Sequence, residues 1–160
     1  MTRATLSILA LWIALWIFPS SANAVLSFSV GGGFIPDGSR PGGLVQGHIG
    51  PITPFAEFFK KSGVTNVNLG VNLILDKTSV SVIHPYGGFG GGISRSSDAV
   101  DSKARTMVNA VTGVNLKLSD AAGLFLQVKY LYSFGSDSGL TNLVVREFII
   151  QGGLKFGIGP

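Results

Sequence analysis

Hydrophobic and polar residues alternate one by one along residues 64–75, VTNVNLGVNLIL. From Val67 onward the odd positions are all aliphatic, and the even positions from Asn66 to Asn72 are Asn or Gly. Successive side chains of a β-strand point to opposite faces, so the pattern predicts a strand with one aliphatic and one small polar face. The polar face has no charge, which suits a crowded, wet interior. We therefore predict an aliphatic face toward lipid and a polar face toward the inside of a barrel.

The same period of two recurs along the rest of the chain and predicts an all-β fold, an eight-stranded antiparallel transmembrane β-barrel. The predicted strands are residues 25–35, 44–49, 52–59, 64–75, 80–93, 105–118, 123–134 and 143–158. The stretch 44–59 is ambiguous, because Pro51 and Pro54 cannot donate ladder hydrogen bonds. We divide it at Gly50-Pro51, because bacterial barrels have an even number of strands.

The predicted connections supply a separate indication of a barrel. Their lengths alternate between long or medium and short, as expected for outer loops and inner turns. They are residues 36–43, the Gly50-Pro51 corner, and residues 60–63, 76–79, 94–104, 119–122 and 135–142.

Lys129 indicates which face of residues 123–134 lies inside. The even positions of this segment are all apolar, from Leu124 to Phe134, whereas Lys129 lies on the odd face. A Lys facing lipid near the midplane would cost about 2 to 4 kcal/mol. Lys129 is therefore predicted to point inward.

The composition agrees with a β-barrel whose apolar face points outward to lipid. Of 160 residues, 12% are charged, which is about half the usual share, and 23 are Gly. No segment after residue 24 has the 18 or so apolar residues of a membrane helix. Because only helices and closed barrels satisfy every backbone group in lipid, strands are the expected spanning elements.

The N-terminus predicts export. Arg3 precedes the apolar run 4–18, and Ala22-Asn23-Ala24 ends the segment with small residues, as in a signal peptide cleaved after Ala24. The predicted domains are thus a signal peptide, residues 1–24, and a barrel, residues 25–160. The alternative, an uncleaved anchor, is disfavoured by the short run and Pro19. Removing Arg3 lowers the formal net charge from +4 to +3, too little and too scattered to indicate nucleic acid.

Three motifs give the chain a family resemblance: PYGGFGGG at 85–92, LFLQVKYLYSF at 124–134 and the closing GGLKFGI at 152–158. With the alternating segments, it resembles the small outer-membrane β-barrels related to the OmpA membrane domain. The resemblance implies localisation in a Gram-negative outer membrane and insertion by the outer-membrane assembly machinery. The closing strand resembles the assembly signal of that class, although the chain ends in Gly159-Pro160 instead of the usual Phe. The matching residues are Gln151, Gly153, Phe156 and Ile158.

The sequence favours a non-enzymatic protein without metal or cofactor. His48 and His84 are the only histidines, neither has a metal-binding spacing, and there is no Cys. His84 could pair with a serine, as in outer-membrane lipid A deacylases, but no His-x-Ser sequence is present. The glycine-rich run 87–92 lacks the Lys-Ser/Thr and the helix of a phosphate-binding loop.

Charges inside a barrel must be paired, and we expect a polar network there. Lys129 and Glu147 would lie within diagonal reach if the last two strands pair. The alternative for Glu147 is a position at the rim, in water. The expected network comprises Lys129, Glu147, Lys117, Gln127, Gln151, Asn66, Asn68 and Asn72.

A barrel of this size has an interior that side chains fill, so a wide pore is not expected. The predicted role is structural, or an interaction of the outer loops with lipopolysaccharide phosphates or with a host or envelope partner. The polar loop residues available for it are Arg40, Arg95, Asp98, Asp101, Lys103 and Asp137.

Two other functions stay open from the sequence. One is a secreted or periplasmic soluble barrel that binds a lipid or another apolar ligand, with the aliphatic faces inside. Its pocket would be lined by Leu69, Val71, Leu73, Leu126 and Val128. The other is a lipid-modifying enzyme of the outer membrane, which would depend on a histidine.

Overall fold

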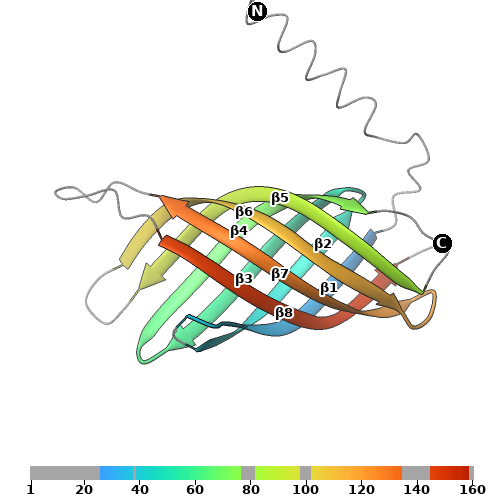
Figure 1. Cartoon of the computed structure of the whole chain (residues 1–160), viewed down its shortest axis with the longest axis horizontal. Coiled ribbons are helices and arrows are strands. Elements are labelled where there is room, and N and C mark those ends of the chain that lie inside the picture. The colour runs from blue at the N-terminus through green and yellow to red at the C-terminus, as the bar shows by residue number, and fades with distance from the viewer. Residues whose placement is uncertain (1–25, 38, 77–81, 98–101, 135–144, 159–160) are drawn as a thin grey trace, which may run out of the picture.

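The computed structural model describes residues 26–37, 39–76, 82–97, 102–134 and 145–158, and these form a closed antiparallel barrel of eight strands (Figure 1). Each strand pairs with its neighbours in the sequence, and β1 closes the barrel against β8 from Leu26 opposite Ile158 to Phe34 opposite Ile150. The predicted fold class is confirmed. The strands are β1 (Leu26–Ile35), β2 (Arg40–Ile49), β3 (Ile52–Lys61), β4 (Val64–Asp76), β5 (Ile83–Ser97), β6 (Ser102–Lys117), β7 (Ala122–Phe134) and β8 (Val145–Ile158).

The two ends of the barrel are distinguished by the strand ends and connections that lie there. We call the end where β1 begins and β8 ends the terminal end, and the opposite end the loop end. Residues 36–39, 62–63, 98–101 and 135–144 connect strands at the loop end, and residues 50–51, 77–82 and 118–121 connect them at the terminal end. The signal peptide predicted for residues 1–24 lies outside the described residues.

The barrel has the polarity that the alternation predicts. On β4, Asn68 and Asn72 are buried, whereas Leu69 and Val71 are 45% and 49% exposed. The outer wall is apolar on every strand. Its exposed large side chains include Leu26, Phe28, Val30, Phe34, Val45, Ile49, Ile52, Phe58, Leu75, Phe89, Ile93, Val108, Leu124, Leu126, Tyr130, Phe134, Phe148 and Leu154. The soluble alternative is therefore wrong, because it required Leu69, Val71 and Leu126 to line a pocket.

The division of residues 44–59 is confirmed, and the structure shows how the prolines are accommodated. Gly50 has a φ of +57° in the corner between β2 and β3, next to Pro51. Pro54 lies within β3, where it has no N–H to donate. The ladder between β2 and β3 runs to Gln46 opposite Phe55 and resumes only at Ile49 opposite Ile52. The pairing is thus interrupted beside Pro54.

Two loop predictions at the loop end are wrong. Residues 40–43 belong to β2, and residues 94–97 and 102–104 extend β5 and β6, so the predicted alternation of connection lengths does not hold. Gly42 was interpreted as part of a turn, but it lies in the interior face of β2. A Cβ at Gly42 would come within 2.8 Å of Cγ of Phe59. This glycine therefore makes room for a ring inside a narrow barrel.

The connection between β3 and β4 is shorter than predicted, for a local reason. Ser62 and Gly63 both have positive φ, +50° and +82°. A type I′ turn has positive φ at both central residues and joins twisted strands in two residues. The strands therefore continue through Lys61 and from Val64.

Candidate functional site

The buried centre of the barrel is an ion pair between strands on opposite sides of the interior. Lys129 of β7 donates a hydrogen bond to Glu57 of β3, and both side chains are fully buried. Nζ of Lys129 also lies 3.6 Å from the centroid of the Phe55 ring. The Lys129 ammonium is therefore attracted both by the Glu57 carboxylate and, through a cation–π interaction, by the face of the Phe55 ring.

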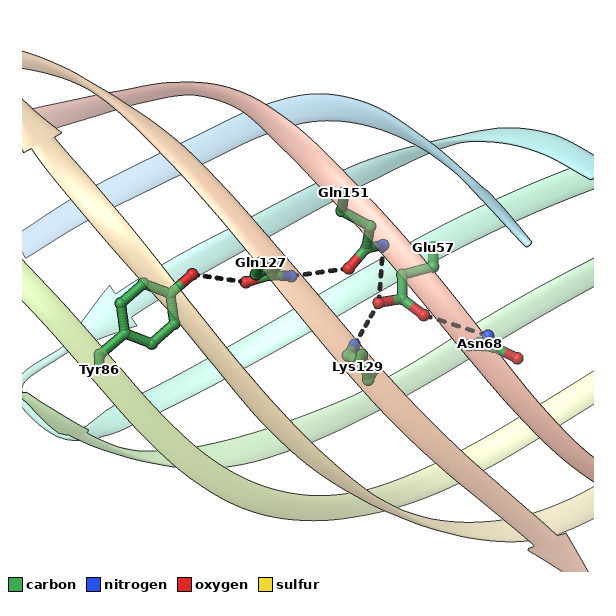
Figure 2. Close-up of polar contacts among 6 residues, drawn as sticks. All are labelled: Glu57, Asn68, Tyr86, Gln127, Lys129 and Gln151. Atoms are coloured by element: carbon green, nitrogen blue, oxygen red, sulfur yellow. Dashed lines mark hydrogen bonds and ion pairs between the residues drawn. The ribbon is translucent and has the colours of Figure 1, made fainter. Parts of the chain in front are cut away.

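Amide side chains extend this ion pair toward both sides of the interior (Figure 2). Nε2 of Gln151 donates to Oε1 of Glu57 at 3.0 Å, and Nε2 of Gln127 donates to Oε1 of Gln151 at 2.7 Å. Asn68 donates to the second carboxylate oxygen of Glu57 at 3.1 Å. The Tyr86 hydroxyl donates to Gln127 at 2.9 Å. The network thus joins β3, β4, β5, β7 and β8 through one carboxylate.

An apolar layer lies between this network and the loop end. Its large side chains are almost fully buried and come from β1, β3, β6, β7 and β8. They are Ile35, Phe59, Met107, Leu131 and Ile149. Because these residues occupy the interior on the loop-end side of Glu57 and Lys129, the barrel is filled.

Glu147 does not pair with Lys129, and that prediction is wrong. Lys129 lies opposite Ile149 in the β7–β8 register, and Glu147 lies opposite Leu131. Glu147 instead pairs with Arg40 at 2.6 Å, near the loop end of the barrel. These side chains meet because β1 is the single strand between β8 and β2.

Lys117 was predicted in the network but lies outside it. It is the last residue of β6 at the terminal end, its side chain is 52% exposed, and it pairs with Asp120 at 2.6 Å. The hydrogen bond from Lys117 lowers the pKa of the Asp120 carboxyl below its ordinary value. The structure places the other predicted members in the interior, with Asn66 accepting a hydrogen bond from the Ser96 hydroxyl near the loop end.

His48 has contacts that the sequence did not reveal. Its Nε2 lies 3.0 Å from Oγ of Ser29, and its Nδ1 lies 3.1 Å from Oγ1 of Thr53. The sequence offers no serine partner by a local His-x-Ser spacing, and Ser29 comes close to His48 only through the register of β1 with β2. Ser29 is fully buried in the interior. Within the described ranges, no three His, Asp or Glu side chains are grouped to hold a metal ion.

The loop-end wall carries basic side chains beside the apolar surface. Lys60 is exposed two residues beyond the outward-facing Phe58 on β3, and Cζ of Arg146 lies 5.9 Å from the centroid of the Tyr132 ring. Nε of Arg95 donates to Oγ of Ser102 at 2.8 Å on the outer face. Lys103 lies on β6 opposite Ser96, whereas Asp98, Asp101 and Asp137 lie outside the described residues.

The four residues of β8 that resemble an assembly signal contact the barrel interior, the outer wall and the neighbouring strand β1. Gln151 points inward to Glu57, and Gly153 packs against the backbone of Val30 on β1. Phe156 stacks on Phe28 with the ring centroids 5.0 Å apart. The backbone of Ile158 pairs with Leu26, which closes the barrel at the terminal end.

No protein-family model and no curated protein sequence matches the chain. Solved structures do match. Neisserial surface protein A is 18% identical with a TM-score of 0.55, over 82% of this chain and 94% of that protein. The N-terminal β-barrel domain of Pseudomonas aeruginosa OprF is 15% identical with a TM-score of 0.53, over 84% of this chain and 96% of that domain.

The outer membrane protein OprG from Pseudomonas aeruginosa is also similar, at 11% identity and a TM-score of 0.52, over 85% of this chain and 95% of that protein. At such low identity the likeness concerns the fold. The chain thus has the fold of these small barrels, with an apolar exterior and a polar interior.

Proposed function

We propose that the protein is an integral outer-membrane β-barrel with a structural or surface-interaction role in the Gram-negative envelope. The observation that carries this proposal is the continuous apolar wall around a closed barrel that encloses the ion pairs Lys129–Glu57 and Arg40–Glu147. In water this wall would be an unusually large exposed apolar surface, whereas in a bilayer it contacts the apolar acyl chains of the lipid. The structural likeness to the outer membrane protein OprG supports this choice of membrane.

The filled interior argues against a role as a wide pore. The apolar layer and the network around Glu57 occupy the interior at successive levels. Small barrels of this type have interiors just wide enough for side chains. A function beyond membrane structure would therefore act at the loop end.

The proposed partner of the loop end is the phosphate-bearing head group of lipopolysaccharide. Lys60, Arg95 and Arg146 point outward at the loop end, beside the apolar wall. At that level a bilayer changes from acyl chains to head groups, and basic side chains gain about 1 kcal/mol each near an anionic surface. Arg40 was also a candidate, but Glu147 already neutralises its charge.

The proposal includes no catalytic step. The Ser29 hydroxyl beside His48 is buried in the barrel, out of reach of a lipid on the outer wall. Export by the segment 1–24 and insertion by the assembly machinery through Gln151, Gly153, Phe156 and Ile158 belong to the same proposal.

The test is lipopolysaccharide binding by the detergent-solubilised protein. A variant with Lys60, Arg95 and Arg146 each changed to Gln should bind about 100-fold more weakly, since three such contacts together contribute about 3 kcal/mol. The matched control is Lys117→Gln, which removes one exposed cation at the terminal end and should bind as the original protein does. Equal binding by all three proteins would refute the lipopolysaccharide contact.

A further inference from the structure

Two buried asparagines flank a glycine on the interior face of the barrel. Asn72 of β4 lies opposite Gly90 of β5, and Gly90 lies opposite Asn109 of β6. The three residues thus form one row across three adjacent strands. Asn72 and Asn109 are 1% and 6% exposed.

The side-chain amides of these asparagines carry atoms without partners. In the described part of the chain, Oδ1 of Asn72 and both Oδ1 and Nδ2 of Asn109 are buried and have no hydrogen-bond partner. Nearly all buried polar side-chain atoms in proteins are paired, because an unpaired buried group loses its hydration without compensation. Three such atoms in one row therefore point to a ligand that can satisfy them.

Between the two asparagines, β5 has no side chain on its interior side. Oδ1 of Asn72 lies against Gly90, so that a Cβ at this position would collide with it and with the carbonyl of Val71. The preceding and following interior positions of β5 are Gly88 and Gly92, which add no side chain. The interior surface between the two amides is therefore glycine backbone, with Oδ1 of Asn72 lying directly against Gly90.

The atoms without partners also define the chemistry of the ligand. Asn72 offers an acceptor, whereas Asn109 offers an acceptor and a donor. A cation would satisfy the oxygens but not the N–H, whereas a water molecule both donates and accepts. Buried waters in proteins usually make two to four hydrogen bonds, about the number available here.

We propose that the row Asn72, Gly90, Asn109 is an internal water-binding site, in which ordered water bridges the amides of Asn72 and Asn109. The bridge links β4 to β6 across a part of β5 whose glycines contribute no interior side chain. It stabilises the wall where the network around Glu57 does not reach. This inference goes beyond the proposed function and does not depend on any lipid partner.

The first test is solution NMR of the full chain with 15N-labelled Asn and Gln side chains. We expect cross-peaks between the Nδ2 protons of Asn109 and long-lived water. Nε2 of Gln127 serves as the internal control, because it donates to Gln151 and should show no such cross-peak. Absence of the Asn109 cross-peak, with the Gln127 resonances resolved, would overturn the proposal.

The second test compares Asn72→Leu, Asn109→Leu and the double variant by equilibrium unfolding in urea. Each single variant removes one anchor of the water and leaves the opposite amide unpaired, so the folding equilibrium constant should fall about tenfold. The double variant should recover most of that loss, since both amides are gone. If each single variant were more stable than the original protein, the amides would be unbridged and the proposal would fail.

Discussion

Two ion pairs inside the described part of the barrel, Lys129–Glu57 and Arg40–Glu147, have the same chemistry and very different surroundings. Lys129 and Glu57 are both fully buried, and the carboxylate also accepts hydrogen bonds from Asn68 and Gln151. In the pair at the loop end, the Arg40 side chain is 22% exposed and Glu147 is 7% exposed. The first pair lies on the terminal-end side of the apolar layer, whereas Arg40 lies opposite Ile35 and Glu147 opposite Leu131, at the level of that layer.

This difference teaches that the position of an ion pair decides what its loss would cost. A buried charge that loses its partner cannot recover its hydration, and the usual cost is about 3 to 5 kcal/mol. A partly exposed charge can turn to water, so surface pairs contribute about 0 to 1 kcal/mol. The central pair should therefore matter most for stability, and the loop-end pair should matter less, because the Arg40 side chain reaches water.

The largest effect is expected from Lys129→Met. The free energy of unfolding should fall by about 3 to 5 kcal/mol, because Glu57 keeps a buried, uncompensated charge. Equilibrium urea unfolding in lipid vesicles measures this change. The control is the double variant Lys129→Met with Glu57→Gln, which removes both charges and should regain most of the lost stability. A double variant as unstable as Lys129→Met would show that packing, not pairing, is the cause.

The next largest effect is expected from a charge placed on the lipid-facing side of β7, the strand that carries Lys129 on its inner side. Leu126 of β7 is 56% exposed on the outer wall, on the face opposite Lys129. Leu126→Lys should lower the free energy of unfolding in vesicles by about 2 to 4 kcal/mol, because the new charge faces the hydrocarbon. Leu126→Met is the size-matched control and should change little. An unchanged stability for Leu126→Lys in vesicles would contradict the lipid-facing wall.

Arg40→Gln should have a smaller effect than Lys129→Met, about 1 to 2 kcal/mol, because Gln at position 40 can still donate a hydrogen bond to Glu147, which is 7% exposed and loses only the opposite charge. The stability difference should shrink further between 0.15 M and 1 M salt, as screening weakens the pair in the original protein. Urea unfolding of both proteins at the two salt concentrations measures the stability difference and its change with salt. A loss as large as that of Lys129→Met would remove the distinction between the two pairs.

The smallest effect is expected from Lys117→Ala at the terminal end. Asp120 is fully exposed, and the pairing with Lys117 lowers the pKa of its carboxyl. The pair contributes to the stability of the fold only while this carboxyl is ionised. That contribution is present above the ordinary pKa of 3.8 and is lost as the pH falls through the lowered value. Unfolding of Lys117→Ala at pH 7 and pH 3 should match the original protein closely at both. A clear loss at pH 7 alone would mean that this pair matters.

The outer wall could be predicted from the sequence, because alternation is a local property of a strand. Leu69 and Asn68 are neighbours in the chain, and their opposite faces follow from the backbone alone. No knowledge of the neighbouring strands was needed. The corner at Gly50 between β2 and β3, in contrast, was located from the expected even number of strands.

The pairing inside the barrel could not be predicted, because it depends on how the closed sheet brings distant strands together. Lys129 was matched with Glu147 on the adjacent strand, but its partner Glu57 lies across the interior on β3. Glu57 was missed because it lies in the ambiguous stretch with two prolines. One signal was present: Glu57 and Glu147 are the only acidic residues within the predicted strands.

The most direct test of the central claim, a closed barrel in the outer membrane, is fractionation of cells that express the full chain. Each fraction is run on a gel with and without boiling, because a closed barrel stays folded in detergent until it is heated. We expect an outer-membrane band whose mobility shifts only after boiling. A periplasmic band that does not shift would contradict it.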